Sequence, residues 1–445
     1  MTATVAVEQD ISAYEALKTK IKNKSITVGV IGLGYVGLPL LIEKVTAGLN
    51  VVGFDLNEAR VMQLSQRESY IGDISNKVLA SAFDSGRFRV TSNSNLMGEA
   101  DVLVICVPTP LDKHDCPDLT YVTSACHDIS QCLRPGQLIS LESTTYPGTT
   151  QEILRPILEK SGLSVGKDFF LAYSSERVDP GNTRFTTKNT NKVVGADDQK
   201  SLELASAFYR LAIERLVIVS NTKTAEMAKV FENTFRSVNV ALVNQMTLLC
   251  HQMDIDVWEM LDAAFTKPFG IMPFYPGPGV GGHCIPVDPH YLEWKAKELH
   301  FNTSLINLSG EINRSMPNFV VERVQKILNK KMQSVNGAKL LIIGVSYKEN
   351  VGDCRDAPAI QVIKLLQEEG AKIQYHDPYV ESLDVNGYIY NSTSLIEKNL
   401  VDQNCVLILT NHRAVDYHLI AQSAKLIFDT RNVAELKSVA SVIRL

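Results

Sequence analysis

One cysteine lies in a short stretch that is rich in glycine and proline. Residues 276–288 read PGPGVGGHCIPVD and place a single thiol, Cys284, among four glycines and three prolines. Glycine lets a backbone turn tightly and approach a ligand closely, and proline stiffens parts of the same loop. The pattern favours a loop that holds a substrate against a cysteine nucleophile. A glycine-rich surface turn with an inert thiol is the alternative that this stretch alone leaves open.

A second group of polar side chains lies on a predicted helix. Residues 222–252 contain neither glycine nor proline, which indicates one long helix. Lys229, Asn233 and Arg236 follow one another at i, i+4 and i+7 and therefore share a face. Such a face suits an anionic substrate, whereas an ordinary solvated helix face is the alternative. A helix of this length between two α/β halves is also a natural dimer element.

The elements that position a cofactor come early in the chain. An apolar run over residues 26–31 predicts a buried parallel strand, and Gly32, Gly34 and Gly37 follow it in GxGxxG spacing. These glycines would provide a tight turn, a close approach to a pyrophosphate and close helix packing, while the helix N-terminus offers amide donors. Asp55 ends the next strand and suits the ribose hydroxyls of NAD, although Arg60 lies near it in sequence.

Later strands end in loops that are rich in threonine, serine and proline. The segments 101–110, 137–150 and 169–181 each begin with an apolar strand pattern. In an open α/β sheet ligands bind beyond the carboxyl ends of the strands, so Thr109, Thr144 and Glu176 are expected to face the cofactor or substrate. Ordinary turn chemistry is the alternative for the two threonines.

A second α/β pattern opens at Lys339 and has no GxGxxG turn. It therefore need not hold a dinucleotide, and a uridine diphosphate is the expected occupant. The sequence predicts an α/β protein with an N-terminal Rossmann NAD domain over residues 25–220, a central long-helix dimerisation domain over 221–330, and a C-terminal Rossmann-like UDP-binding domain over 331–445. Residues 1–24 form an extension, expected as a short helix or a loose tail.

Bulk composition narrows the class of protein. The 445 residues carry a net charge of -5, which gives no sign of a nucleic-acid partner. No apolar run is long enough to span a membrane, and the first residues lack a signal-peptide pattern, so a cytoplasmic protein is expected. Eight scattered cysteines without a CxxC pair are expected to be free thiols.

Taken in order, the motifs resemble those of the UDP-glucose/GDP-mannose dehydrogenase family. They are GLGYVG, VPTP, ESTTYPGTT, SSERVDPG, the Lys229/Asn233 helix, GVGGHCIPVDP, GVSYKENVGDCRD and DTRN, and the resemblance runs from about residue 25 to the end. The longer pieces VPTPLDKH and TKPFGIMPFYPGPGVGGHCIPVDP look most like the UDP-N-acetylglucosamine 6-dehydrogenase branch. That branch supplies N-acetylated uronic acids for bacterial surface polysaccharides such as O-antigen or capsule.

The resemblance implies a role for individual residues. Cys284 matches the catalytic cysteine, Lys229 and Asn233 match the residues beside the reacting carbon, and Asp288 and Glu176 match the acids that assist water or proton transfer. The cofactor contacts implied are those of Gly32, Gly34, Tyr35, Val36, Gly37, Asp55, Arg60, Thr109, Thr144 and Arg355. The nucleotide-sugar contacts implied are those of Arg177, Val178, Lys229, Asn233, Arg236, Gly281, Tyr347, Lys348 and Arg431. Ser175 replaces the proline that usually precedes the glutamate in the family.

The chemistry implied is a four-electron oxidation of a sugar C6 alcohol, with NAD as acceptor and with a thiohemiacetal and a thioester on Cys284. UDP-N-acetylglucosamine is the expected substrate, and UDP-N-acetylgalactosamine, UDP-N-acetylmannosamine and UDP-glucose are the alternatives. A non-catalytic NAD-binding redox sensor is the rival outside the enzyme class. No metal is expected, because His283, Cys284, Asp288 and His290 match no zinc spacing. A homodimer or a higher homo-oligomer is expected.

Overall fold

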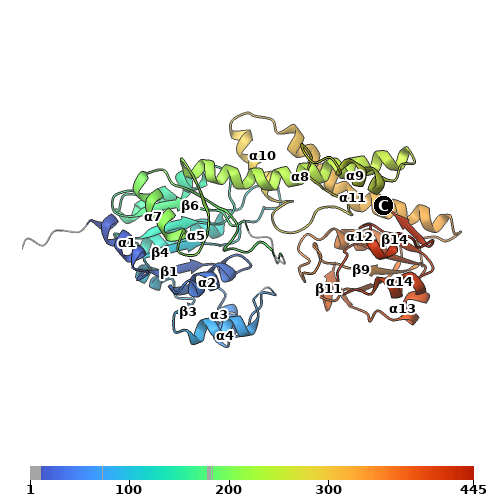
Figure 1. Cartoon of the computed structure of the whole chain (residues 1–445), viewed down its shortest axis with the longest axis horizontal. Helices are drawn as coiled ribbons and strands as arrows, with labels where there is room; N and C mark the ends of the chain where they lie inside the picture. The colour runs from blue at the N-terminus through green and yellow to red at the C-terminus, as the bar shows by residue number, and fades with distance from the viewer. Residues whose placement is uncertain (1–11, 73, 178–181, 183) are drawn as a thin grey trace, which may run out of the picture. The chain divides into compact units, whose positions relative to one another are not determined.

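The computed structural model describes residues 12–72, 74–177, 182 and 184–445 and shows two compact units (Figure 1). One unit contains the described residues up to Phe231 together with His290–Lys295, and the other contains Glu232–Pro289 and Ala296–Leu445. Both units are α/β, as expected. The part of the chain that connects the two sheets in sequence is mainly helical. In the described part of the chain no helix has the length and apolarity needed to cross a bilayer.

The first unit is built on an eight-stranded sheet with the strand order β3-β2-β1-β4-β5-β6-β7-β8, parallel except for the antiparallel β6–β7 pair. The chain passes from β1 outward to β2 and β3 and returns to β4 on the other side of β1. The strands are β1 (Thr27–Ile31), β2 (Asn50–Phe54), β3 (Phe88–Thr91), β4 (Val102–Ile105), β5 (Leu138–Leu141), β6 (Phe170–Tyr173), β7 (Lys192–Gly195) and β8 (Leu216–Val219). The helices are α1 (Ala13–Lys22), α2 (Gly37–Thr46), α3 (Glu58–Ser65), α4 (Asn76–Asp84), α5 (Thr120–Cys132), α6 (Arg155–Leu158) and α7 (Gln199–Tyr209).

Strand residues alternate between two cores, one on each face of this sheet. In β4, Val102 and Val104 pack with residues of α1, α2 and α7, whereas Leu103 and Ile105 pack with residues of α5 and α6. Because both faces are covered, every residue of β4 is buried, which explains its continuous apolar sequence. The expected N-terminal helix is α1, and its Leu17 joins the first of these cores.

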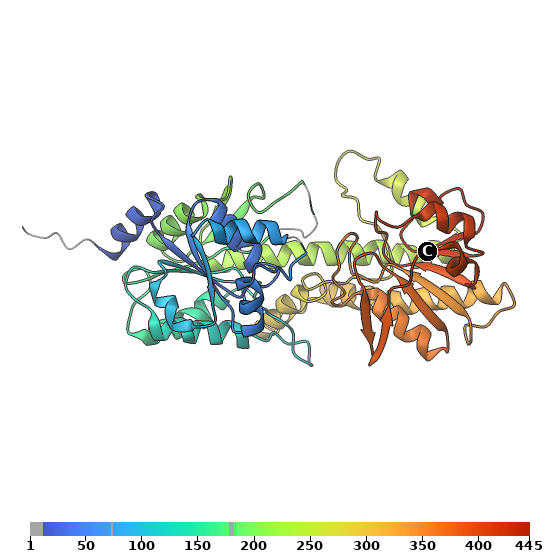
Figure 2. The ribbon, with the colours of Figure 1, turned by 90° about the horizontal axis from the view of Figure 1, so that it is seen from below.

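The second unit is built on a five-stranded parallel sheet with the order β10-β9-β13-β14-β15. One face packs against α11 and α12 and the other against α13 and α14 (Figure 2). The strands are β9 (Lys339–Ile343), β10 (Lys372–His376), β13 (Cys405–Ile408), β14 (Ile427–Asp429) and β15 (Val442–Arg444), with a hairpin of β11 (Ser382–Val385) and β12 (Tyr388–Asn391). The helices are α9 (Val257–Ala264), α11 (Ser304–Asn329), α12 (Pro358–Glu368), α13 (Glu397–Val401) and α14 (Tyr417–Ser423).

Two further helices contribute residues to both units. Helix α8 (Thr222–Gln252) has the bounds expected from the sequence, because no glycine or proline interrupts its 31 residues. Helix α10 (Asp288–Glu298) begins four residues after Cys284, with proline in its first turn, where a missing backbone N–H costs nothing. The three stretches expected from the sequence thus correspond to two compact units, with the helical segment shared between them.

Helix α2 buries a lysine in the first of the cores described above. The Lys44 side chain is fully buried, and its Nζ has no hydrogen-bond partner among the described residues. The Nζ lies 4.5 Å from the ring centroid of Phe208 and 5.0 Å from that of Tyr209. Burial lowers the pKa of Lys44 from 10.5 to about 8. The aromatic rings therefore compensate only part of the lost hydration of the ammonium.

Replacing this lysine should stabilise the fold at neutral pH. Because the folded pKa of about 8 lies below the unfolded value, the unfolded state binds more protons between these values, and stability rises with pH across that window. At pH 7 the full cost is present, so Lys44→Met is expected to raise the free energy of unfolding by up to about 3 kcal/mol. Urea denaturation of the wild type and the variant, at pH 7 and at about pH 10, measures the free energy of unfolding.

Lys22→Met, on an exposed position of α1, is the matched control and should leave stability unchanged. The Lys44 variant should also lose the rise in stability between these two pH values. A lower stability of Lys44→Met at pH 7 would contradict the assignment of Lys44 as a destabilising buried charge.

Candidate active site

The glycine turn after β1 is shaped by backbone contacts that exclude side chains. Gly32 has a φ of +88°, and a Cβ there would lie 2.8 Å from the carbonyl oxygen of Cys106. A Cβ on Gly37 would lie 1.9 Å from the carbonyl oxygen of Gly32. These two glycines therefore let α2 start directly beside the strand, with its N-terminus at the end of β1.

Gly34 differs from its two neighbours in the motif. A Cβ on Gly34 would meet no heavy atom of the described residues within 4 Å. The chain's own packing thus gives no reason for a glycine there, whereas the close approach of a ligand does. Space beside a backbone at a helix N-terminus fits the pyrophosphate of a dinucleotide. Tyr35 and Val36, at the start of α2, are partly exposed beside it.

Asp55 closes the same turn from the end of β2. One carboxylate oxygen accepts the N–H of Leu33 at 2.9 Å, and the other accepts the N–H of Asn57 at 2.9 Å. Arg60 Nη1 lies 3.9 Å from Asp55, and its guanidinium lies over the ring of Tyr70. The acid is therefore oriented at the carboxyl edge of the sheet, where a ribose would be bound. These residues fit NAD.

The loops after β4 and β5 meet the middle of α10. The Tyr291 hydroxyl donates to the carbonyl oxygen of Thr109 at 2.9 Å, and the rings of Tyr146 and Trp294 lie 4.8 Å apart. Thr109 is buried, and Thr144 is half-buried two residues before Tyr146. Both threonines thus lie at the strand ends where the sequence placed them, and Tyr291 is a supporting contact that the sequence analysis missed.

A buried ionic network supports Glu176 from inside the first unit. Lys192 Nζ donates to Glu142 at 2.7 Å and to the carbonyl oxygen of Ser175 at 3.1 Å, and it lies 3.9 Å from a carboxylate oxygen of Glu176. The Tyr209 hydroxyl donates to the other oxygen of Glu142 at 2.7 Å. Burial raises the pKa of Glu142, and the pKa of Lys192 is also raised, because its two carboxylate neighbours outweigh the effect of burial. Lys192 therefore fixes the backbone next to Glu176, where the family's usual proline is absent.

The loop that carries Cys284 lies against the ends of β9 and β14 in the second unit. A Cβ on Gly282 would lie 2.8 Å from the ring of Tyr347, and one on Gly281 would lie 2.9 Å from the Tyr347 Cβ. The Gly282 N–H donates to the carbonyl oxygen of Arg355 at 3.1 Å. Upstream, a Cβ on Gly277 would lie 2.6 Å from the Arg431 guanidinium. The glycines thus permit side-chain packing that fixes the loop, and Cys284 itself is exposed.

Asn233 and Asp288 meet directly, although 55 residues separate them. Both side chains are buried, and the Asn233 amide donates to an Asp288 carboxylate oxygen. The Asp288 N–H in turn donates to the carbonyl oxygen of Cys284 at 2.8 Å. Lys229, one turn earlier on α8, is also buried, whereas Arg236 is exposed. A carboxylate, an amide and the cysteine backbone thus form one connected group.

The remaining sequence-predicted residues are distributed as follows. Arg355 makes a bidentate ion pair with Asp353, at 2.6 Å for its Nη2, and Arg431 donates from Nε to the carbonyl oxygen of Leu409 at 2.7 Å. Burial lowers the pKa of Arg431 to about 10. Arg177, in the first unit, donates to the carbonyl oxygen of Asn191. Val178 lies outside the described residues.

Two asparagines that the sequence analysis did not select hold the start of the cysteine loop. Asn244 Oδ1 accepts the N–H of Gly277 at 3.2 Å, and its Nδ2 donates to Asn313 at 3.0 Å. Asn313 Nδ2 donates to the carbonyl oxygen of Ser237 at 3.1 Å. An asparagine inside a long helix is a weak sequence signal, and the sequence pattern predicted a functional role only for Asn233. Among the described residues no group of three or more His, Cys, Asp or Glu side chains is arranged to hold a metal ion.

Known protein families match the chain along most of its length. Three domains of the UDP-glucose/GDP-mannose dehydrogenase family match in order: the NAD binding domain over residues 26–213, the central domain over 223–315 and the UDP binding domain over 341–436. The UDP-N-acetyl-D-glucosamine 6-dehydrogenase of Pseudomonas aeruginosa is 38% identical over 363 residues, which cover 81% of this chain and 85% of that protein.

Two archaeal proteins are similar over nearly their whole length. The UDP-N-acetyl-D-mannosamine dehydrogenase of Methanocaldococcus jannaschii is 36% identical over 430 residues, covering 93% of this chain and 95% of that protein. The solved structure of the UDP-D-ManNAc dehydrogenase from Pyrococcus horikoshii has a TM-score of 0.85 and 32% identity, covering 94% of this chain and 98% of that one.

A glycine turn for NAD, a second α/β sheet for a uridine nucleotide and a cysteine loop between them in sequence define an NAD-dependent nucleotide-sugar dehydrogenase. The chain belongs to the UDP-glucose/GDP-mannose dehydrogenase family, which confirms the resemblance drawn from its motifs. Its cofactor is NAD, and its substrate is a UDP-sugar.

The packing of the cysteine loop predicts a sharp difference between two glycines. Gly282 and Gly270 both have positive φ values, +86° and +74°, so alanine carries a similar backbone cost of about 1–2 kcal/mol at each. Of these two glycines only Gly282 faces a side chain, whereas a Cβ on Gly270 meets no heavy atom within 4 Å in the part of the chain that the structure describes. Gly282→Ala should displace the loop and lower kcat/KM for the UDP-sugar at least about tenfold. Gly270→Ala is the control, and NADH formation measures both.

Equal activities of the two variants would show that the loop accommodates a methyl group beside Tyr347. That outcome would contradict the close packing described for Gly282.

Proposed function

We propose that the chain oxidises the C6 alcohol of a UDP-N-acetylhexosamine to the uronic acid in two NAD-dependent steps. UDP-N-acetylglucosamine is the leading substrate, supported by the similarity to the Pseudomonas aeruginosa protein. The similarity to the Methanocaldococcus jannaschii protein favours UDP-N-acetylmannosamine as the second candidate. The observation that carries the mechanism is the exposed Cys284 on a fixed loop, joined through its backbone to the buried Asp288–Asn233 pair.

Cys284 is the proposed nucleophile. Its thiolate attacks the C6 aldehyde left by the first oxidation and gives a thiohemiacetal, which the second oxidation converts to a thioester. Water then cleaves the thioester, releasing the carboxylate and restoring the thiol. NAD supplies the hydride acceptor in both oxidations. In sum, one alcohol, two NAD⁺ and one water give one carboxylate, two NADH and three protons.

The residues around the nucleophile have distinct proposed roles. Lys229 and Asn233 stabilise negative charge on the sugar oxygen, an effect worth about 3 kcal/mol per donor. Asp288 orients the Asn233 amide and takes or returns protons, and Glu176 orients the attacking water. The contacts that join Asn233, Asp288 and the Cys284 carbonyl support the roles of Asn233 and Asp288.

The binding residues divide between the two nucleotides. We assign the cofactor to residues 25–220, the helical connection to 221–330 and the UDP moiety to 331–445. The proposed cofactor contacts are Gly32, Gly34, Tyr35, Val36, Gly37, Asp55, Arg60, Thr109, Thr144 and Arg355. The proposed UDP-sugar contacts are Arg177, Val178, Arg236, Gly281, Tyr347, Lys348 and Arg431, together with Lys229 and Asn233.

The proposal predicts two NADH for each sugar consumed. Purified protein is offered UDP-N-acetylglucosamine, UDP-N-acetylmannosamine, UDP-N-acetylgalactosamine and UDP-glucose in turn, and NADH and uronic acid are quantified. The highest kcat/KM is expected with UDP-N-acetylglucosamine. Two NADH from another sugar would keep the mechanism and replace the substrate, and one NADH per sugar would contradict the four-electron scheme.

Cys284→Ser tests the covalent mechanism, because the serine hydroxyl, unlike the cysteine thiol, does not form an anion near neutral pH. Uronic acid formation should fall by more than about a thousandfold, since removal of a catalytic nucleophile can cost about a millionfold in kcat. Cys116→Ser, at another partly exposed thiol, is the control and should keep the wild-type rate. Uronic acid formation by Cys284→Ser at the wild-type rate would exclude the covalent mechanism.

We also propose that the protein forms a homodimer. Helix α8 exposes large apolar side chains, a surface that monomers rarely leave in water. They are Met227, Phe231, Phe235, Leu242 and Leu249. Sedimentation equilibrium should give twice the 49.2 kDa mass of one chain, and Leu242→Glu should shift it toward the monomer. A monomeric wild type would contradict the proposal.

A further inference from the structure

Two loops leave the carboxyl edge of the second sheet at the point where its strand order reverses. From β9 the chain goes to β10 on one side and later returns to β13 on the other, so the strand order reverses between β9 and β13. In open α/β sheets the crevice that binds ligands lies at such a reversal. The loop after β9 carries Tyr347 and Lys348, and the loop after β13 carries His412. A ligand in this crevice would meet the first loop, so what fixes that loop determines the shape of the site.

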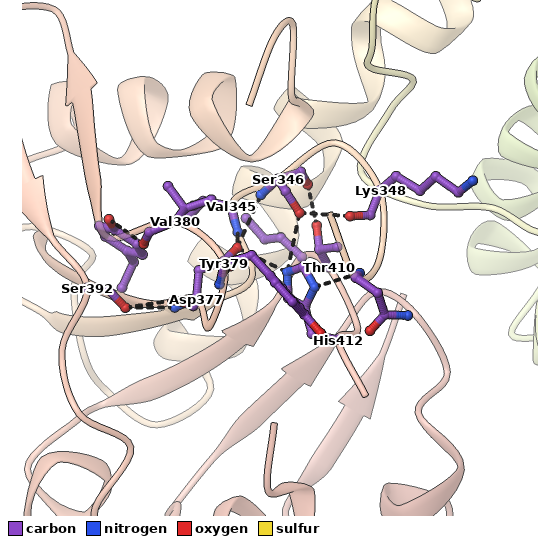
Figure 3. A network of polar contacts seen from close by, with 12 residues as sticks. Val345, Ser346, Lys348, Asp377, Tyr379, Val380, Ser392, Thr410 and His412 are labelled. Carbon is purple, nitrogen blue, oxygen red and sulfur yellow. Dashed lines mark hydrogen bonds and ion pairs between the residues drawn. The ribbon is translucent and has the colours of Figure 1, made fainter. Parts of the chain in front are cut away.

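His412 connects the two loops through both nitrogens of its ring. Figure 3 shows the ring among Ser346, Asp377, Tyr379 and Thr410. Nδ1 accepts the backbone N–H of Asn350 at 2.9 Å, and Nε2 lies 3.0 Å from an Asp377 carboxylate oxygen. Both the His412 and the Asp377 side chains are buried. The imidazole thus spans from the end of β10 to the far end of the loop after β9.

These contacts determine which nitrogen carries the proton. A backbone N–H can only donate, so Nδ1 must present its lone pair to Asn350. The proton therefore lies on Nε2, which donates to Asp377 and faces the Ser346 hydroxyl at 3.3 Å. The Ser346 hydroxyl donates its own proton to the carbonyl oxygen of Lys348 at 2.8 Å and can accept from Nε2. One neutral tautomer satisfies every one of these contacts.

Asp377 and Thr410 hold the near end of the same loop. One Asp377 oxygen accepts the N–H of Val345 at 2.8 Å, and the Thr410 hydroxyl donates to the carbonyl oxygen of Ser346 at 2.7 Å. Although burial acts to raise the pKa of Asp377, the hydrogen bonds from His412 and Val345 hold it below its ordinary value. The loop after β9 is therefore held at residues 345–346 and at Asn350, and residues 347–349 lie between these two anchored positions.

Tyr347 connects the loop after β9 to the cysteine loop. Its ring and Cβ form the surface on which Gly281 and Gly282 lie, and its N–H donates to the carbonyl oxygen of Asp353 at 2.9 Å. A shift of the loop after β9 would move this surface and hence the backbone two residues before Cys284. The buried histidine lies outside the group that would touch the sugar, yet it sets that group's position.

We infer that His412, as the Nε2-protonated neutral tautomer, is a positioning residue that clamps the loop carrying Tyr347 and Lys348 into the shape that binds the UDP moiety. The inference rests on the proposed binding of UDP at this edge of the second sheet. Its essential contact is the one from Asn350 to Nδ1, because that contact alone ties the far end of the loop to the imidazole.

Two amide substitutions separate the two ring nitrogens. Asparagine places its Oδ1 near the position of Nδ1, so His412→Asn keeps an acceptor for Asn350. Glutamine places its amide nitrogen near Nε2, so His412→Gln keeps the donor to Asp377 and loses that acceptor. Calorimetric titration of the full-length protein with UDP should show about tenfold weaker binding for His412→Gln and little change for His412→Asn. NAD binding should be unchanged in both.

His376→Phe is the matched control. His376, in the same sheet, bonds through its ring to the carbonyl oxygen of Thr393 at 2.7 Å, which lies outside the loop after β9. UDP affinity should remain at the wild-type value in this variant. Amide hydrogen exchange of residues 347–353 gives a second reading, with faster exchange in His412→Gln than in His412→Asn.

Each outcome has a definite meaning. Wild-type UDP affinity in His412→Gln, or a larger loss in His412→Asn than in His412→Gln, would overturn the clamp through Asn350. If neither variant folds, unchanged hydrogen exchange of residues 347–353 in a milder His412→Met variant that does fold would overturn it. Absence of UDP binding by the wild type, with NAD binding intact, would instead refute the proposed function on which the inference rests.

Discussion

The absence of a side chain at Gly281 and Gly282 is the constraint on which the geometry of the cysteine loop depends. The backbone of the cysteine loop lies directly on Tyr347, at distances that leave no room for a Cβ. Tyr347 is in turn held by a loop whose ends are bound to buried groups, among them Asp377. The Cys284 thiol can thus be exposed on an irregular loop and still be fixed in position, because the backbone beneath it is anchored to a sheet.

Each sheet carries a buried carboxylate that is bonded to a nitrogen-bearing side chain just behind its binding edge. In the first unit Lys192 bonds to Glu142, and in the second His412 bonds to Asp377. Such pairs are a weak source of stability, because the loss of hydration offsets most of the attraction. They specify geometry instead, since an unpaired charge in either place would be costly. Lys44 shows the contrast, because it is buried without a hydrogen bond to any described residue and its pKa falls to about 8.

The two sheets have different turns beside the point where their strand order reverses. Each is parallel at its centre and reverses its strand order beside its first strand, which creates a crevice at the carboxyl edge. In the first sheet, Gly32 and Gly37 bring a helix N-terminus to the crevice and suit a pyrophosphate that needs amide donors. The second sheet has no such turn and instead presents the loop with Tyr347 and Lys348. One chain can therefore hold two different nucleotides.

The sequence by itself determined the elements and the family, because those signals are local. The GxGxxG turn, Asp55, the bounds of α8 and the order of the motifs all depend on neighbouring residues. Only the tertiary structure joined Asn233 to Asp288 across 55 residues and placed Tyr347 under Gly282. The role of His412 was equally hidden, since an isolated histidine after a strand has no periodic or spaced partner. Pairing across a fold depends on strand order and loop path, which no single stretch of residues records.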